Sequence, residues 1–225
     1  QALVAAAGDA EIGPAAGWQQ DAAVARGGDQ SLAVWVDGRT DVLGIANFGS
    51  GPYQELDLGS LWDIYAARVD AQGTVIDTTP IVVTQEAYNQ HQPAVAWNGS
   101  HWLVAWSGQA LGTFGNRVVN IYAARVAPDG TVLDQPPLTI DTTEPQDDLL
   151  WPSVGSDGTN WLVVWRDLDD AGWAGQVALQ DGTVETRETP RLRARTVWGG
   201  ALALGHGGRL RDLPQELRDA LQDQD

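Results

Sequence analysis

The chain has 225 residues and a formal charge of −17, with 13 arginines and no lysine against 30 acidic residues. This negative charge repels the phosphates of nucleic acids and anionic membrane surfaces, so neither is expected as a partner. Cysteine is absent, which excludes disulfides, zinc–thiolate sites and thiol catalysis. No stretch reaches the roughly 18 consecutive apolar residues of a membrane-spanning helix, so no membrane span is expected.

A repeated segment organises the chain. Pro93–Trp106 reads P-A-V-A-W-N-G-S-H-W-L-V-A-W, and Pro152–Trp165 reads P-S-V-G-S-D-G-T-N-W-L-V-V-W. Ala22–Trp35 aligns with both segments without a gap. Self-similarity of this kind is the signature of a repeat architecture, so the sequence predicts three copies of one structural unit.

A second repeated block follows in the first two copies. Ile64–Val69 and Ile121–Val126 both read I-Y-A-A-R-V and lead into a G-T-V turn. The third copy is degenerate, because Gly172–Val177 reads G-W-A-G-Q-V and lacks the arginine. We expect Arg68 and Arg125 to brace one unit against the next through a carboxylate.

Each copy resolves into four short strands, which in the second copy lie at about 93–97, 101–106, 120–127 and 131–140. Glycine-containing links read as hairpins. In Trp102–Trp106 both alternating sets of side chains are apolar, so the strand is covered on both faces. Repeated sheets of this kind predict an all-β, β-propeller-like fold of three four-stranded antiparallel blades. The aromatic side chains expected to be buried at equivalent positions between blades are Trp35, Trp106 and Trp165.

The pattern P-x-V-A-x-x-G-x-x-W-L-V-x-W, followed by I-Y-x-x-R-V-x-x-x-G-T-V, resembles the bladed repeats of secreted bacterial β-propeller proteins. The likeness covers about residues 12–190. It implies a secreted or cell-surface location. It implies no particular activity, because such repeats occur in proteins of many roles.

The expected blades lie at about residues 22–83, 93–141 and 152–190, within a partial propeller over residues 1–190. Residues 191–225 are expected to form an arginine- and glycine-rich link and a short C-terminal helix. A closed ring takes roughly four to eight blades, so three blades predict part of a larger ring, completed by a companion chain or a second copy. The absence of methionine favours a processed or excised chain.

The links between strands differ in length in a regular way. Links from strand one to two and from three to four are tight, whereas links from two to three and on to the next copy are long. Alternate connections of an up-and-down sheet lie at the same end, so the long links should gather at one end, where binding function concentrates. The candidate ligand-binding residues there are Asp37, Arg39, Tyr53, Tyr88, His91, Asp147, Asp148, Trp151 and Arg166.

The segment R-D-L-D-D-A-G supplies the candidate metal ligands Asp167, Asp169 and Asp170, because clustered carboxylates suit the oxygen preference of calcium. A solvated acidic turn is the alternative for the same cluster. The sequence contains no G-x-S-x-G, H-E-x-x-H or G-x-G-x-x-G motif. The function predicted is therefore a non-enzymatic module that binds a carbohydrate or a protein. Two alternatives stay open: a structural subunit of a surface assembly or processed complex, and a catalytic propeller of glycosidase or lyase type.

Overall fold

The computed structural model describes residues 19–39, 62–86, 88–111, 117–142, 148–167, 172–178 and 181–185. Within these ranges each set of four consecutive strands pairs into one antiparallel sheet. Blade 1 consists of β1 (Gln19–Gly27), β2 (Gln30–Asp37), β3 (Asp63–Asp70) and β4 (Ile81–Thr84). Blade 2 consists of β5 (Gln90–Trp97), β6 (Trp102–Leu111), β7 (Arg117–Val126) and β8 (Leu138–Asp141). Blade 3 consists of β9 (Leu149–Ser156), β10 (Trp161–Asp167), β11 (Gly172–Ala178) and β12 (Val184–Glu185).

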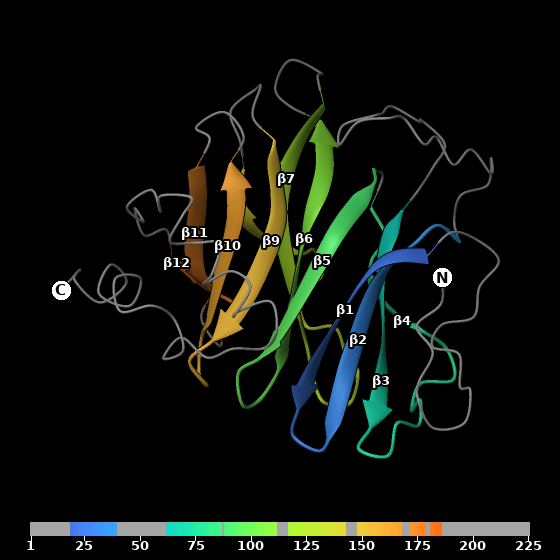
Figure 1. The fold of residues 1–225 in the computed structure, drawn as a ribbon. Helices are drawn as coiled ribbons and strands as arrows, with labels where there is room; N and C mark the ends of the chain where they lie inside the picture. The colour runs from blue at the N-terminus through green and yellow to red at the C-terminus, as the bar shows by residue number, and fades with distance from the viewer. Residues whose placement is uncertain are drawn as a thin grey trace.

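The three sheets share one strand order and one register. In each blade the strands pair in chain order, and the first two strands reproduce the gapless sequence alignment. The equivalent pairs are Val24–Ala33, Val95–Val104 and Val154–Val163. The predicted all-β architecture of three four-stranded antiparallel blades is therefore confirmed (Figure 1).

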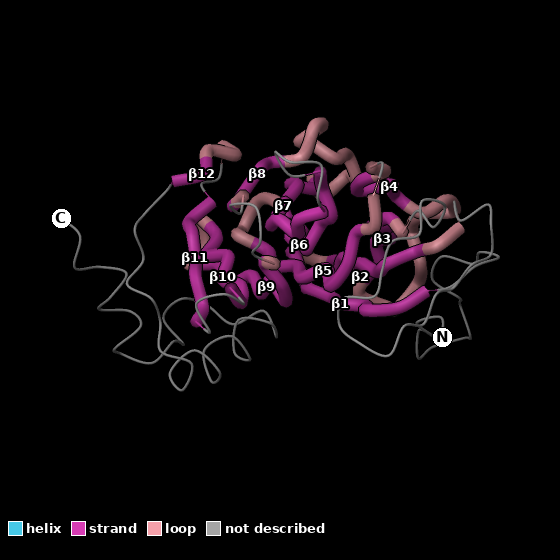
Figure 2. Tube along the Cα trace, turned by 90° about the horizontal axis from the view of Figure 1, so that it is seen from above, coloured by secondary structure: helices cyan, strands magenta, loops and turns pink. Residues whose placement is uncertain are grey.

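The blades fan out from their first strands. β1 lies beside β5, and β5 lies beside β9. Figure 2 shows the other strands of each blade extending outwards from these three. We call the side on which β1, β5 and β9 lie the inner-strand side; it faces the viewer in Figure 1. Consecutive propeller blades have this radial arrangement around a central axis.

Apolar side chains fill both seams between the blades. Trp106 belongs to the core between blades 1 and 2, and Trp165 belongs to the core between blades 2 and 3. Trp35 lies in a smaller cluster with Tyr65, on the face of blade 1 that points away from blade 2. All three tryptophans are buried, so their predicted burial is confirmed.

Two other tryptophans join neighbouring blades by hydrogen bonds. The indole N–H of Trp102 donates to the carbonyl of Ala25, and that of Trp161 donates to the carbonyl of Ala96, both at 3.1 Å. Each bond runs from a second strand to the first strand of the preceding blade. Blade 1 has Ser31 at this position, so it lacks the indole that makes this link.

The repeated arginines pair within their own blades. Arg68 binds Asp77 with its backbone N–H, Nε and Nη2, and Arg125 binds Asp134 in the same way. Arg68 Nη1 also donates to the carbonyl of Pro128 in blade 2 at 2.8 Å. The expected link between blades is therefore present for Arg68, but it runs through a carbonyl, and the carboxylate partner belongs to the same blade.

The fourth strand differs from its predicted extent. β8 is short, and before it Val132 forms only an isolated bridge with Val126. Pro136 and Pro137 occupy the interval between them, and proline has no N–H to donate to a sheet. The predicted strand over 131–140 is therefore interrupted by its own prolines.

Blade 3 also differs from the predicted alignment of its third strand. Trp161 pairs with Ala178, as Trp102 pairs with Val126. Residues 173–178, rather than 172–177, are thus equivalent to residues 121–126. Val177 takes the place of Arg125, so blade 3 has no counterpart of the repeated arginine.

The expected C-terminal link and helix at 191–225 lie outside the described residues. In the part of the chain that the structure describes, no helix is long and apolar enough to cross a membrane.

Candidate functional site

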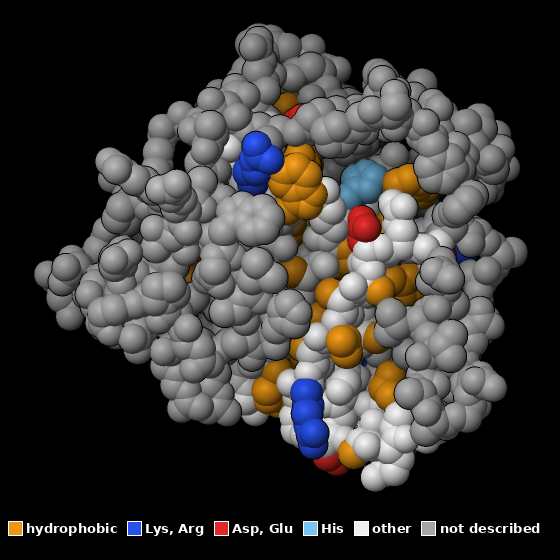
Figure 3. All heavy atoms as spheres, viewed as in Figure 1, with side chains coloured by type: hydrophobic (Ala, Val, Ile, Leu, Met, Phe, Trp, Pro, Cys, Tyr) orange, Lys and Arg blue, Asp and Glu red, His pale blue; other side chains and the backbone are white. Residues whose placement is uncertain are grey.

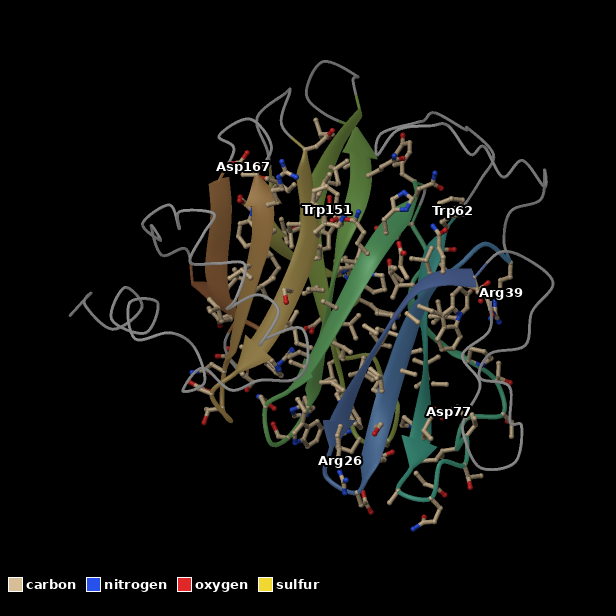
Figure 4. The ribbon with its side chains drawn as sticks, in the orientation of Figure 1. Arg26, Arg39, Trp62, Asp77, Trp151 and Asp167 are labelled. Carbon is tan, nitrogen blue, oxygen red and sulfur yellow. The ribbon has the colours of Figure 1, made fainter. Side chains whose placement is uncertain are left out.

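The long links gather at one end of the blades. Figure 4 shows Trp62, Trp151 and Asp167 in the upper part of the molecule and Arg39 below them on the right, where β2 and β10 end and β3 and β9 begin. The label of Asp77 lies at the opposite end, near the tight turns. We call the upper end the long-loop end.

The structure describes most of the predicted site residues. Four of them lie outside the described ranges: Tyr53, Asp147, Asp169 and Asp170. The others all lie at or beside the long-loop end: Asp37, Arg39, Tyr88, His91, Asp148, Trp151, Arg166 and Asp167. Among the described residues no three His, Asp or Glu side chains form a group that could hold a metal ion. Two of the three candidate calcium ligands are not described, so the calcium site stays a prediction.

Asp37 is the centre of a hydrogen-bond network within blade 1. Its Oδ2 accepts the indole N–H of Trp35 at 2.9 Å and the side-chain amide of Gln19 at 3.0 Å. Arg39 donates its backbone N–H and Nε to Oδ1 and its Nη2 to Oδ2. The guanidinium of Arg39 also lies 4.2 Å from the centre of the Tyr65 ring. Asp37 and Arg39 thus fix the end of β2.

The pKa of Asp37 reflects these contacts. Burial alone raises the pKa of a carboxyl group, because it disfavours the charged form. The bonds from Arg39, Trp35 and Gln19 outweigh burial and lower the pKa of Asp37 below its ordinary value of 3.8. Asp37 is therefore a buried, charged and fully engaged carboxylate.

The first strand of each blade carries an unusual residue near the long-loop end. Asp21, Gln92 and Trp151 have φ angles of 51°, 53° and 51°, which non-glycine residues rarely adopt. They occupy equivalent positions, and each lies at a β-bulge in its strand. Such conformations cost on the order of 1–3 kcal/mol each and persist only where surrounding contacts enforce them.

These three residues are linked from blade to blade. The backbone N–H of Gln92 donates to the carboxylate of Asp21. The backbone N–H of Trp151 donates to Oε1 of Gln92 at 2.8 Å, and Ser107 Oγ donates to the same oxygen at 3.2 Å. The side chain at this position in one blade therefore holds the backbone of the next blade. We call Asp21, Gln92 and Trp151 the bulge series.

Trp151 ends the bulge series with an exposed aromatic ring. Its side chain is 38% exposed, whereas the equivalent Gln92 uses its side chain inside the protein. The guanidinium of Arg166 lies 5.3 Å from the centre of the Trp151 ring, within the range of a cation–π contact. Figure 3 shows a basic side chain directly beside a large hydrophobic one near the long-loop end of the inner-strand side.

His91 lies next to the bulge series in β5. Its ring meets that of Trp62 edge to face, with 5.2 Å between ring centres. Burial lowers the pKa of His91 to about 4, so the imidazole is neutral at pH 7. His91 therefore contributes a neutral aromatic surface to this region.

Acidic groups dominate the charge of the long-loop end. The described carboxylates there include Asp21, Asp37, Asp63, Asp141, Asp148 and Asp167. Desolvation raises the pKa of Asp21 and of Asp141, and the charge of Asp167 raises the pKa of Asp141 further. The arginines of this end are Arg39, which is paired with Asp37, Arg117, which begins β7, and Arg166, which lies over Trp151. This balance disfavours an anionic ligand.

Sequence reasoning missed Asp21 and Gln92 as members of this region. The signal that finds them is their position in the repeat, because each is equivalent to Trp151. Trp62 is brought to His91 by backbone bonding, since the N–H of Gln90 donates to the carbonyl of Trp62 at 2.7 Å. The corresponding positions of blades 2 and 3 are joined as well, because Val119, the equivalent of Trp62, forms an isolated parallel bridge with Asp148.

Comparison with known proteins gives a limited result. No family model matches the sequence, and no curated protein shows significant similarity to it. Among solved structures, the chain is similar to a subtype N11 neuraminidase-like protein of A/flat-faced bat/Peru/033/2010 (H18N11), with a TM-score of 0.40 and 11% identity over 77% of this chain. The match spans 53% of that protein, about half its length. The propeller-like fold of this chain rests on the strand pairing of its three sheets and not on this similarity.

Proposed function

We propose that the protein is a non-enzymatic binding module that recognises an uncharged carbohydrate at the long-loop end, on the inner-strand side. The observation that carries this proposal is the exposed ring of Trp151. An aromatic ring with one open face provides a large, rigid contact surface at low entropic cost, and the C–H face of a sugar ring is its complement.

The backbone of Trp151 supports this role. Its left-handed conformation is held by Gln92, and its side chain is flanked by Arg166. Pre-organisation of a contact residue reduces the free energy spent on ordering it when the ligand binds. Arg166 and Asp21 are exposed polar groups of the same region, and they supply hydrogen-bond donors and acceptors for hydroxyl groups.

Charge narrows the ligand class. The chain carries −17 overall, and carboxylates outnumber arginines at the long-loop end. Acidic sugars and other anionic ligands are repelled by this field. A neutral glycan is therefore the carbohydrate class that the site favours.

One observation favours the catalytic alternative. Asp141 and Asp167 interact electrostatically across the seam of blades 2 and 3, and burial together with Asp167 raises the pKa of Asp141. Two carboxyl groups with different proton affinities are what glycoside hydrolysis uses. A glycosidase of this type requires hydrolysis of the bound glycan, which the binding module does not perform.

The partner proposed for assembly is a companion chain rather than a second copy. A head-to-tail second copy would place blade 3 against another blade 1, where the inter-blade links are absent. Ser31 replaces the linking tryptophan and Val177 replaces the repeated arginine. The side chain of Trp151 has no acceptor oxygen for the backbone of the next bulge. A companion chain of different sequence can contact blades 1 and 3 through other residues.

The surface left for such a companion is narrow. Apolar residues on the two outer blade faces are already buried within the single chain: Ala33, Trp35, Tyr65 and Ala67 in blade 1, and Leu162 and Val164 in blade 3. At these described residues the outer faces therefore leave little apolar surface for a companion to cover. Two valines stay exposed on this face of blade 1: Val24, which is 55% exposed whereas the equivalent Val95 is 4% exposed, and Val82, which is 36% exposed.

A glycan array that displays neutral and acidic glycans tests the proposed function. Binding to neutral glycans without release of product supports the binding module, and binding with hydrolysis supports the glycosidase. An array without signal above that of a heat-denatured sample contradicts both. Secretion is part of the proposal through the repeat resemblance alone, and fractionation of the source cells tests it separately.

A further inference from the structure

The bulge series contains a residue whose side chain faces away from the proposed ligand and towards the backbone of Trp151. Gln92 Oε1 accepts the backbone N–H of Trp151 at 2.8 Å across the seam between blades 2 and 3. The same oxygen accepts Ser107 Oγ at 3.2 Å, so the amide is oriented from two sides. Gln92 itself is held by Asp21, which accepts its backbone N–H.

This contact falls at the point where the chain of Trp151 leaves regular strand geometry. Trp151 has a φ of 51°, and the register of β9 against β10 shifts at this position. A residue in this conformation returns to the ordinary β region unless its surroundings hold it. Pro152 restricts Trp151 from the other side, because the residue before a proline is driven towards extended conformations. The acceptor on Gln92 therefore opposes the local preference of the chain.

The orientation of the Trp151 ring depends on this backbone conformation. A change of φ from the left-handed region to the β region redirects the Cα–Cβ bond and carries the ring away from Arg166. The stacked pair of Trp151 and Arg166 thus requires the acceptor in the neighbouring blade.

We propose that Gln92 is a positioning residue, which sets the direction of the Trp151 ring through its backbone N–H and so determines carbohydrate affinity without touching the ligand. The expected effect of Gln92 on carbohydrate affinity rests on the proposed function. Its structural consequence, the fixed orientation of Trp151, is independent of any ligand.

The test compares two glutamines that each join neighbouring blades by one hydrogen bond. Gln92→Met removes the acceptor at the long-loop end and keeps the length of the side chain. Gln30→Met is the matched control, because Gln30 Nε2 donates to the carbonyl of Pro128 at 2.9 Å at the opposite end. Gln92→Glu is the conservative variant, since it keeps an acceptor oxygen at the same distance from the backbone.

Two readouts are measured on the full chain. The first is the indole N–H resonance of Trp151 in a nitrogen-15 NMR spectrum, assigned by its absence in Trp151→Phe. The second is apparent affinity on the neutral-glycan array. We expect Gln92→Met to move the Trp151 resonance and to weaken array binding on the order of threefold to tenfold, the effect of one hydrogen bond. Gln92→Glu and Gln30→Met are expected to retain both properties.

The outcomes separate this inference from the function on which it rests. A Trp151 resonance and array signal in Gln92→Met that match those of Gln30→Met overturn the positioning role. An array without signal for the unmodified protein overturns the proposed function, and the resonance then decides the positioning role alone. If Gln92→Met does not fold, Gln92→Asn replaces it, because its amide is one methylene too short to reach the Trp151 N–H.

Discussion

The indole N–H of Trp106 donates to Oε1 of Gln90 at 2.7 Å, and neither neighbouring blade repeats this bond. In blade 1 the equivalent Trp35 donates to Asp37 instead. In blade 3, Leu149 stands at the position of Gln90, and the buried Nε1 of Trp165 has no hydrogen-bond partner among the described residues. The three equivalent tryptophans thus differ in the acceptor of the indole N–H.

This difference predicts unequal effects of the same substitution. Trp106→Phe removes a donor and leaves the buried oxygen of Gln90 unpaired, whereas Trp165→Phe removes a donor that has no acceptor. Both variants lose the same side-chain volume. Because an unpaired buried polar group costs about 1–3 kcal/mol, we expect Trp106→Phe to lower the free energy of unfolding by that much more than Trp165→Phe.

Urea denaturation of the two variants measures this difference directly. Equal losses, or a larger loss for Trp165→Phe, would show that Trp165 has an acceptor in solution and that the comparison of blades does not hold.

The pKa of Asp37 predicts how stability depends on pH. Its folded-state pKa lies below the ordinary value of 3.8, so the unfolded chain binds a proton more readily than the native protein. The stabilisation from Asp37 is therefore complete above about pH 5 and is lost as the pH falls through the lowered folded-state pKa. Asp21 and Asp141 have raised pKa values and act in the opposite direction.

The contribution of Asp37 is isolated by subtracting the stability of Asp37→Asn from that of the unmodified protein at each pH. We expect this difference to be largest near pH 6 and to shrink steadily between about pH 5 and pH 2. A difference that is independent of pH over this range would mean that Asp37 is not charged in the native protein.

The outer faces of blades 1 and 3 predict whether the purified chain is a monomer in solution. The links that join blades 1, 2 and 3 have no counterparts between blade 3 and blade 1 of another copy, since Ser31 and Val177 replace the linking residues. We expect light scattering of the purified chain to give a monomer of 24.0 kDa. A stable particle of twice this mass would favour closure by a second copy over a companion chain.

Much of the fold could be predicted because the residues that recur in the three copies are the buried ones. Trp35, Trp106 and Trp165 keep their spacing from a preceding valine and glycine, and this fixes both the register and the buried face of the second strand. β11 had lost these markers, so its alignment was displaced by one residue. The predicted extent of β8 was wrong because Pro136 and Pro137, which have no N–H to donate, interrupt a segment that otherwise has the apolar pattern of a strand.

The candidate site was harder to predict, because its geometry comes from contacts between blades. Asp21, Gln92 and Trp151 share a backbone conformation but not a residue type, so no motif marks them. The residue type at Gly108 is also set by a neighbouring side chain. A side chain there would collide with Oε1 of Gln90, whereas blades 1 and 3 accommodate Asp37 and Asp167 at the equivalent positions. The residue type at such positions depends on the side chain packed against it and cannot be inferred from the neighbouring sequence.

The measurement that tests the central claim most directly is a calorimetric titration with the neutral glycan that gives the strongest array signal. The unmodified protein is compared with Trp151→Ala and with Ile76→Ala, which removes a side chain 41% exposed near the tight turns. Alanine substitution of an aromatic side chain that stacks on a nucleic-acid base costs about 1–3 kcal/mol. On the same scale for a sugar ring, the account predicts at least a fivefold loss of affinity for Trp151→Ala and none for Ile76→Ala. Equal affinity for all three proteins would contradict it.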